Sequence, residues 1–258
     1  MIELKSTPEL DQMAKSGAII AALFTELESR VEPGVSTLDL DTFAETFIRS
    51  HDGAVPIFKG LYGFPGTLCT SINEEVVHGI PSATRRLADG DIISIDVGVK
   101  LDGWCGDSAR TFEVGDIGED ARRLVEVTRR SLDRAIAAAV PGNHVGDIGH
   151  AVESVVEGTG FNIIRDLVGH GVGRQVHEDP QVPNLGRPGE GPLLREGMVL
   201  AIEPMIAVGT WRIRTLSDRW TMSTSDDSLS AHCEHTVAVT AEGPRILTAS
   251  EGAVPSIP

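Results

Sequence analysis

The chain has 258 residues, 41 % of them hydrophobic and 23 % charged, which is typical of a soluble globular protein with a substantial core. Its formal net charge of −16 argues against direct nucleic-acid binding, because an acidic surface repels phosphates. It contains no run of about 18 apolar residues, so no membrane span is expected. The first five residues lack the basic and apolar segments of a secretory signal, and a cytoplasmic location is therefore expected.

Amphipathic helices are predicted near the start of each half of the chain. Across residues 10–31, apolar side chains recur at alternating steps of three and four, which places them on one face of a helix. Thr7 is expected to cap this helix, and Ser36 is expected to cap the next one. Residues 125–139 and 148–155 predict a second pair of helices by the same spacing.

Each pair of helices is followed by segments that predict strands. Residues 92–99 and 109–114 lie on either side of a polar, glycine-containing turn at residues 102–104, a pattern typical of a β-hairpin. Residues 198–208 and 236–240 predict a second pair of strands with a longer connection between them. The two halves therefore share the order helix, helix, strand, strand.

The chain also repeats itself in its residues. Residues 87–96 align with residues 194–203 at an offset of 107, since both read as an acidic-glycine turn, a short apolar strand and a carboxylate. Pro33-Gly34 aligns with Pro141-Gly142 at an offset of 108. Two nearly equal offsets favour duplication over chance.

The predicted fold class is α+β, with duplicated α-α-β-β halves related by a pseudo-twofold axis. The strands of both halves are expected to join in one antiparallel sheet, with helices on one face and the other face free to build a site. We predict a single domain over residues 1–258, with the repeat at about residues 7–115 and 119–245.

Four carboxylates occupy matched places in the two halves. Asp96 and Glu203 end equivalent strands, and Asp107 and Glu234 begin their partners. A strand-end acid is usually a solvated surface group, but a pseudo-twofold axis would gather these four, and their repulsion would then require cations. Two divalent ions are expected, with Mn²⁺, Fe²⁺ or Co²⁺ suited to such ligands and Zn²⁺ as an alternative.

Three histidines are candidates for the same site. His170 lies between glycines in residues 168–173, which lets the backbone approach a ligand closely, although a simple surface loop would look the same. A phosphate-binding loop is less favoured, because no helix pattern follows the glycines. His177 and His78 are further candidates. The chain has no GxSxG motif, and its three widely spaced cysteines read as reduced, buried thiols, so metal-activated water is the favoured hydrolytic chemistry.

Five stretches of the chain, residues 69–81, 90–97, 169–174, 201–205 and 228–236, resemble the methionine aminopeptidases, in particular their short bacterial form. The resemblance covers nearly the whole chain and implies the pita-bread fold. It also implies metal-dependent removal of the initiator methionine from nascent proteins and peptides, with a preference for a small second residue.

The resemblance implies a role for each metal-binding candidate. Asp107 and Glu234 would bridge two metal ions, Asp96 would bind one of them, and His170 and Glu203 would bind the other. A hydroxide between the metals would attack the scissile carbonyl, and one metal would meet the free α-amine of the substrate.

The resemblance also implies which other residues contact the substrate. Glu203 would assist proton transfer, His177 would hydrogen-bond the scissile carbonyl oxygen, and His78 would contact the amide on the leaving side. The methionine side chain would meet apolar and sulfur-containing walls, which suit a thioether. Those walls would be Phe58, Phe64, Cys69 and Trp220.

This sequence departs from the family pattern at the rim of the methionine pocket. Val176 stands where many members carry phenylalanine, and Leu61 where many carry tyrosine. A wider pocket is therefore expected. For Phe58 and Phe64, ordinary core packing is an equally weighted alternative to a role in the pocket.

The resemblance implies that the partners are the N-termini of nascent polypeptides, with the ribosome as a candidate partner, and a monomer is expected. Two other functions compete with this one. Proline-directed peptidases share the fold but usually carry a large extra N-terminal domain. Non-enzymatic binding proteins of the same fold tend to have lost metal ligands, whereas all five ligand positions are filled here.

Overall fold

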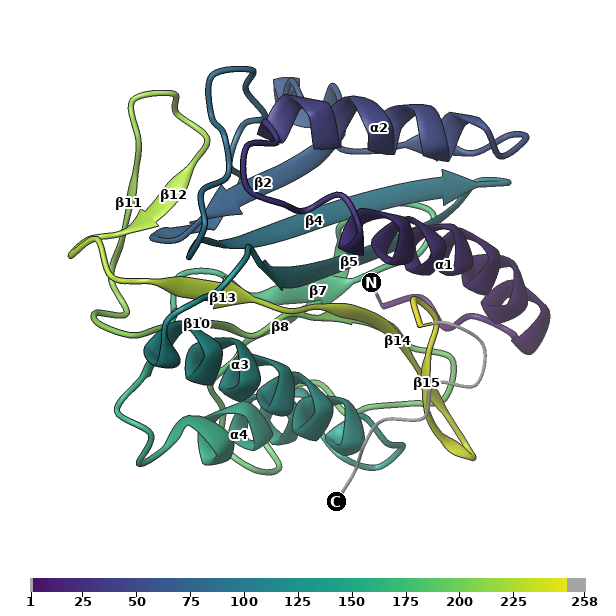
Figure 1. Ribbon diagram of the computed structural model, residues 1–258. Helices are drawn as coiled ribbons and strands as arrows, with labels where there is room; N and C mark the ends of the chain where they lie inside the picture. Colours follow the sequence, from purple (N-terminus) through teal and green to yellow (C-terminus); the bar gives the residue numbers. More distant parts are fainter. Residues whose placement is uncertain (1, 250–258) are drawn as a thin grey trace.

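The computed structural model describes residues 2–249 of the chain (Figure 1). Within this range lie four α-helices: α1 (Thr7–Glu28), α2 (Thr37–Arg49), α3 (Glu119–Ala138) and α4 (Val145–Val156). No helix of the described part combines the length and apolar character needed to cross a membrane. The outermost residues of the predicted domain, residues 1 and 250–258, lie outside the described range.

The strands of the described range are short apart from one long central hairpin, and a single 3-10 turn, η1, accompanies them. The hairpin is formed by β4 and β5. The elements are β1 (Val55–Pro56), η1 (Leu61–Gly63), β2 (Leu68–Ile72), β3 (Glu75–Val77), β4 (Ile92–Leu101), β5 (Trp104–Glu113), β6 (Asn162–Ile163), β7 (Gly169–Gly171), β8 (Glu178–Val182), β9 (Val199–Ile202), β10 (Met205–Ala207), β11 (Ile213–Thr215), β12 (Met222–Thr224), β13 (Ser230–His232), β14 (His235–Thr240) and β15 (Gly243–Ile246).

The strand pairings are antiparallel, as predicted, but they divide into four sheets rather than one. β1, β4 and β2 form one sheet with β5 on β4, and β15, β14, β9, β7 and β8 form another. The two smaller sheets have the orders β13-β10-β6 and β11-β12-β3. The prediction of a continuous sheet was wrong because the strands of the second half change partners along their length.

One predicted strand of the second half is in fact two. β9 pairs with β14, whereas β10 pairs with β13 in a different sheet. Glu203 and Pro204 lie between them. Proline has no N–H to donate to a ladder, so the chain leaves one sheet at this point and enters the next. The predicted hairpin of the first half is confirmed, with its turn at Asp102 and Gly103 (φ +52° and +82°).

The helix starts follow local capping rules. Ser36 caps α2 as predicted, and its capping box closes on Asp39. At α1 the cap is Ser6 rather than Thr7, because only Ser6 has a glutamate three residues later: Glu9 Oε2 accepts hydrogen bonds from Ser6 N (2.8 Å) and Ser6 Oγ (2.7 Å). The N-cap of α1 therefore lies one residue before the predicted position.

The duplication is visible in equivalent backbone pairings. Ser36 bridges Arg86 in the first half, and His144 bridges Leu193 in the second. His144 is also the N-cap of α4 and lies 108 positions after Ser36, the N-cap of α2. The offset of 108 residues therefore relates two equivalent helix starts. Each of them pairs with an equivalent loop in its own half.

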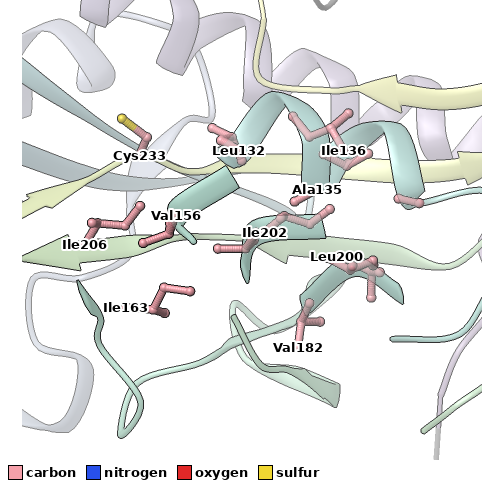
Figure 2. Packing of buried hydrophobic residues seen from close by; sticks show 14 of the residues in the cluster. Leu132, Ala135, Ile136, Val156, Ile163, Val182, Leu200, Ile202, Ile206 and Cys233 are labelled. Atoms are coloured by element: carbon pink, nitrogen blue, oxygen red, sulfur yellow. The ribbon is translucent and has the colours of Figure 1, made fainter. Parts of the chain in front are cut away.

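The hydrophobic core lies between each helix pair and its strands. α1 packs beside β4 and β5, and α2 packs beside β1 and β2 (Figure 1). α3 packs beside β10 and β13, and α4 packs beside β6 and β8. Figure 2 shows Leu132 and Ile136 of α3 gathered with Leu200 and Ile202 of β9. Side chains alternate in direction along a strand, so burying Ile202 against the helices turns the next residue, Glu203, towards the opposite face.

The two halves meet where β5 passes β14. Glu234 N donates to Ala109 O (2.8 Å), and Ser108 Oγ donates to Glu234 O (2.6 Å). Thr236 Oγ1 accepts from Asp107 N (3.0 Å) and donates to Asp107 O (2.7 Å). These bonds tie the backbones of two predicted metal ligands, Asp107 and Glu234, to the opposite half of the molecule.

Candidate metal centre and active site

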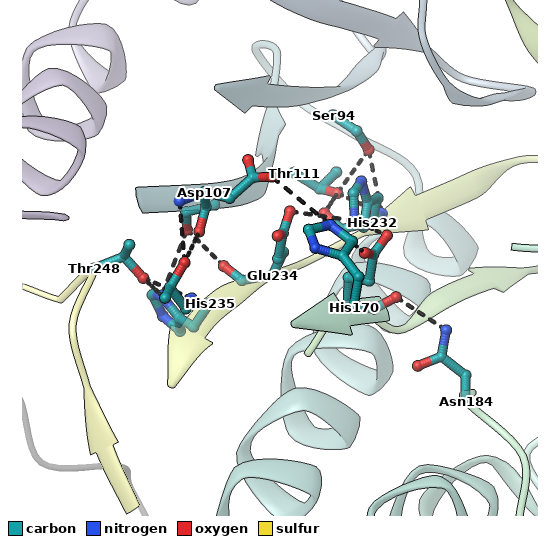
Figure 3. A network of polar contacts seen from close by, with 12 residues as sticks. Ser94, Asp107, Thr111, His170, Asn184, His232, Glu234, His235 and Thr248 are labelled. Carbon is teal, nitrogen blue, oxygen red and sulfur yellow. Dashed lines mark hydrogen bonds and ion pairs between the residues drawn. The ribbon is translucent and has the colours of Figure 1, made fainter. Parts of the chain in front are cut away.

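Three of the five predicted metal ligands form a compact group. The ligand atoms of Asp107, His170 and Glu234 all lie within 4.8 Å of one another. Figure 3 shows them converging from β5, β7 and the link between β13 and β14. Asp107 and Glu234 are only 3 % and 2 % exposed, so their carboxylates face the interior of the protein and not the solvent.

Glu203 adjoins this group through His170. His170 Nε2 lies 3.5 Å from Glu203 Oε1 and 3.8 Å from Asp107 Oδ2. His170 Nδ1 lies 2.9 Å from the carbonyl oxygen of Gly171, which can only accept, so Nδ1 carries the proton and Nε2 presents a lone pair. Burial, with a smaller contribution from His177, lowers the pKa of His170 to about 4 and keeps the ring neutral.

The carboxylates of the site cannot all ionise without a counter-charge. Burial raises the pKa of Asp96 to about 7. Burial and repulsion by neighbouring carboxylates also raise the pKa values of Asp107, Glu203 and Glu234 well above their usual range. Four acids with these pKa values in one place are a strong indication of a functional site.

The donor set fits divalent cations. Within the described residues, Asp96 Oδ1, Asp107 Oδ1 and Glu234 Oε1 are buried oxygens with no hydrogen-bond partner. A buried, unsatisfied carboxylate oxygen is costly unless it binds a cation. Carboxylates with one neutral imidazole suit transition-metal ions, so these residues are consistent with the predicted metal centre.

His232 is a further polar group of the site that the sequence reasoning did not identify. Its Nε2 lies 3.7 Å from Glu203 Oε2 and 3.9 Å from Glu234 Oε2, and its side chain is 2 % exposed. Burial, with a smaller effect of nearby His78, lowers the pKa of His232 to about 3. A signal was available in the sequence, because residues two apart on an extended chain share a face and His232 lies two residues before Glu234.

The metal-binding candidates lie at the wall of a cavity of about 670 Å³. The cavity contains an apolar compartment lined by Phe58, Leu61, Phe64, Cys69 and Trp220, and Val176 packs in the same buried cluster without lining the cavity. The rings of Phe64 and Trp220 meet edge to face with centroids 5.2 Å apart. Such a compartment offers aromatic and sulfur surface to an unbranched apolar side chain.

Two further histidines, His177 and His78, line the same cavity. His177 packs edge-on against His170, with ring centroids 4.5 Å apart. His78 has a left-handed backbone (φ +60°), a conformation that is strained for a non-glycine residue and is found preferentially at functional sites. The cavity is lined by every site residue proposed from the sequence: Phe58, Phe64, Cys69, His78, Asp96, Asp107, His170, His177, Glu203, Trp220 and Glu234.

A duplicated antiparallel fold with buried carboxylates and a neutral histidine beside an apolar cavity defines the class of metal-dependent hydrolases. The chain belongs to metallopeptidase family M24, whose sequence model matches residues 11–241. It is 51 % identical to a methionine aminopeptidase of Clostridium acetobutylicum, over 97 % of this chain and 100 % of that one.

Solved structures agree with this family. The crystal structure of methionine aminopeptidase from Thermotoga maritima matches with a TM-score of 0.95 and 44 % identity, over 97 % of this chain and 100 % of that one. The prolidase of Pyrococcus horikoshii matches with a TM-score of 0.78 and 22 % identity, over 96 % of this chain and 64 % of the prolidase. The likeness to prolidase is one of fold alone. The predicted pita-bread fold and the resemblance to methionine aminopeptidases are confirmed.

Proposed function

We propose that this chain is a metal-dependent aminopeptidase that removes methionine from the N-termini of new polypeptides and peptides. The observation that carries the proposal is the adjacency of two features in one cavity: a group of buried carboxylates and histidines, and a compartment of aromatic and sulfur-containing side chains. The first feature suits metal-assisted hydrolysis, and the second suits the side chain of methionine.

We assign Asp96, Asp107, His170, Glu203 and Glu234 as the ligands of two divalent metal ions. Support for this assignment comes from their buried, partnerless oxygens and from the free Nε2 of His170. When bound, the metal ions supply Lewis-acid chemistry, which polarises the scissile carbonyl and increases the acidity of water. Mn²⁺, Fe²⁺ and Co²⁺ are the proposed ions, with Zn²⁺ as an alternative.

The remaining polar groups are assigned to proton transfer and orientation. Glu203 lines the cavity beside His170, so its carboxyl group is placed to accept a proton from water and to return it to the leaving amine. His177 donates a hydrogen bond to the scissile carbonyl oxygen, which stabilises the charge that develops on it. His78 contacts the amide of the second residue of the substrate.

The methionine side chain is proposed to occupy the compartment of Phe58, Phe64, Cys69 and Trp220. Val176 packs in the same cluster as Phe58, Phe64 and Cys69. The proposal also includes a preference for a small second residue in the substrate. It further includes action as a monomer, a cytoplasmic location and an encounter with the ribosome.

The proposal is tested by stripping the protein of metal, adding back Mn²⁺, Co²⁺, Fe²⁺ or Zn²⁺, and measuring free methionine released from Met-Ala-Ser. We expect metal-dependent release that falls by at least about a hundredfold in Asp107→Asn, because that change removes a shared carboxylate. The matched control is Asp116→Asn, since Asp116 is 94 % exposed and far less constrained.

An X-Pro dipeptide serves as the competing substrate in the same assay. Cleavage of X-Pro with no release from Met-Ala-Ser would replace the methionine assignment with a proline-directed one. Folded, metal-loaded protein that hydrolysed neither substrate would contradict an enzymatic function altogether.

A further inference from the structure

Tyr62 is an exposed aromatic residue held in an unfavourable backbone conformation. It is the one tyrosine of the chain, and it is 80 % exposed. Its φ of +51° and ψ of +15° lie in the left-handed region, which bulky residues rarely adopt. Gly60 and Gly63 on either side (both φ +91°) give the turn the freedom to hold it there.

Packing does not account for the position of this ring. Among residues 2–249, the ring of Tyr62 meets one other ring, that of His177, nearly parallel at 12° but with centroids 6.4 Å apart, close to the outer limit for aromatic pairs. At 80 % exposure, Tyr62 gains little from burial. A strained and solvent-facing aromatic residue beside an active site therefore calls for a functional explanation.

Tyr62 lies on the outward side of the proposed catalytic groups. His170 packs against His177 at 4.5 Å, and His177 faces Tyr62, so three rings lead from the carboxylates to the solvent. Tyr62 also lines the same cavity. Its neighbour Leu61 packs on the apolar compartment, so the turn η1 touches both the proposed methionine pocket and the opening.

We propose that Tyr62 and His177 form a subsite for the substrate backbone beyond the scissile bond, at the third and fourth residues. This inference rests on the proposed function. The methionine side chain would fill the apolar compartment and the scissile carbonyl would face His177, so the rest of the peptide leaves past the outer face of His177, where Tyr62 stands. A phenol ring offers a flat face to peptide groups and a hydroxyl group to backbone acceptors, and it loses little entropy in doing so.

The subsite predicts a dependence on peptide length. Each extended residue adds roughly 3.4 Å, so a dipeptide ends close to the catalytic groups whereas a tetrapeptide reaches the opening. We expect kcat/KM to rise about three- to tenfold from Met-Ala to Met-Ala-Ser-Lys, mainly through KM, since an interaction formed in the ground state and kept in the transition state lowers KM.

Two substitutions separate the ring from the turn. Tyr62→Asn removes the ring but keeps the left-handed backbone, which asparagine tolerates better than other non-glycine residues. We expect this variant to lose most of the rise in kcat/KM from Met-Ala to Met-Ala-Ser-Lys, with each rate compared to the variant's own rate on Met-Ala. Tyr62→Phe keeps the face of the ring and is expected to retain most of the increase in kcat/KM with peptide length.

A binding measurement that needs no turnover completes the test. Because the chain has one tyrosine, protein grown with 3-fluorotyrosine gives a single ¹⁹F resonance, at Tyr62. The metal-loaded protein is titrated with uncleavable reduced-amide analogues of Met-Ala and Met-Ala-Ser-Lys. We expect the resonance to shift with the longer analogue and to stay in place with the shorter one.

The outcomes distinguish this inference from the proposed function. A resonance unmoved by either analogue, or a length dependence that survives in Tyr62→Asn, overturns the subsite even if the parent releases methionine normally. A parent that releases no methionine contradicts the proposed function, and the ¹⁹F titration still decides whether Tyr62 meets a bound peptide.

Discussion

His232 Nε2 lies 3.7 Å from Glu203 Oε2, on the side of the carboxylate opposite His170. Both oxygens of Glu203 therefore have an imidazole beside them. Within the described residues His232 Nε2 has no hydrogen-bond partner, and the groups nearest to it are carboxylates, which only accept. We infer that Nε2 carries the ring proton and that His232 orients Glu203 as a ligand.

This arrangement predicts a metal-affinity defect in His232 variants. His232→Ala is expected to weaken metal binding by about 10- to 100-fold, as for other groups that orient a metal ligand. His232→Gln retains an N–H donor and is expected to lose less. Competition with a chromophoric chelator measures the affinity, and His150→Ala, an exposed histidine on α4, is the control. Equal affinities in His232→Ala and the parent would refute the role.

Removal of metal is predicted to make the stability of the protein dependent on pH. Asp96 has a folded pKa of about 7, raised by burial above its usual value of about 3.9. A raised folded pKa contributes stability that is present below the unfolded pKa and is lost as pH rises through the folded value. The chelated protein is therefore expected to have a lower Tm at pH 8 than at pH 5.

Calorimetry of the chelated and metal-loaded forms checks this prediction. Metal at a hundredfold excess over its Kd is expected to raise Tm by roughly 5–10 °C at pH 8, and by less at pH 5, where protons compete. In chelated Asp96→Asn the fall in Tm between pH 5 and 8 is expected to be smaller. If Tm fell between pH 5 and 8 as much in chelated Asp96→Asn as in the chelated parent, Asp96 would not be the cause of the pH dependence.

The proposed methionine pocket is predicted to accept side chains larger than methionine. Val176 packs with Phe58, Phe64 and Cys69, at a position where a phenylalanine would occupy more of the compartment. Val176→Phe is expected to lower kcat/KM for ethionyl-Ala-Ser relative to Met-Ala-Ser by about tenfold or more, since one methylene in a pocket is worth that much. Val176→Leu is the control for a smaller change in volume. If Val176→Phe left the ratio of kcat/KM for ethionyl-Ala-Ser to kcat/KM for Met-Ala-Ser unchanged, Val176 would lie outside the substrate pocket.

Much of the fold could be predicted because its rules are local. The turn at Asp102-Gly103 and the cap at Ser36 depend on residues within a few positions of one another, and both are confirmed. The division of the strands into four sheets depends on pairings such as β6 with β10, between segments about 40 residues apart. Periodicity does not specify such partners, so a single sheet was predicted wrongly.

The site was approachable from the sequence because duplication supplies a geometric constraint. Matched carboxylates such as Asp96 and Glu203 are expected near a common axis once two halves are recognised. Their roles as ligands stay predictions until metal binding is measured. Tyr62 could not be anticipated, because its exposure depends on the left-handed conformations of Gly60, Tyr62 and Gly63. His232 was passed over although it lies two residues from Glu234.

A buried ion pair anchors the loop that carries His177. Lys5 Nζ donates to Glu178 Oε2 at 2.8 Å, with the two side chains 4 % and 15 % exposed, and Glu178 Oε1 accepts from Gln175 N at 3.0 Å. Burial opposes ionisation of Glu178, but the hydrogen bonds from Lys5 and Gln175 hold its pKa below the usual range. The segment before α1 is thereby joined to the residue that follows His177.

Lys5→Met is expected to destabilise the protein by about 3–5 kcal/mol, because it leaves Glu178 buried without its partner. Adding Glu178→Gln should recover part of the loss. A depressed folded pKa contributes stability that is present above the unfolded pKa, near 4.3, and is lost as pH falls. The penalty of Lys5→Met, measured by urea unfolding at constant metal, is therefore expected to shrink as pH is lowered below about 4.3.

The exposed pair of Arg245 and Asp11 is the matched control, since it has a similar N–O distance, 2.7 Å, but side chains that are 43 % and 57 % exposed. Arg245→Met is expected to cost less than about 1 kcal/mol. If Lys5→Met cost no more than this control, burial would not have strengthened the pair of Lys5 and Glu178.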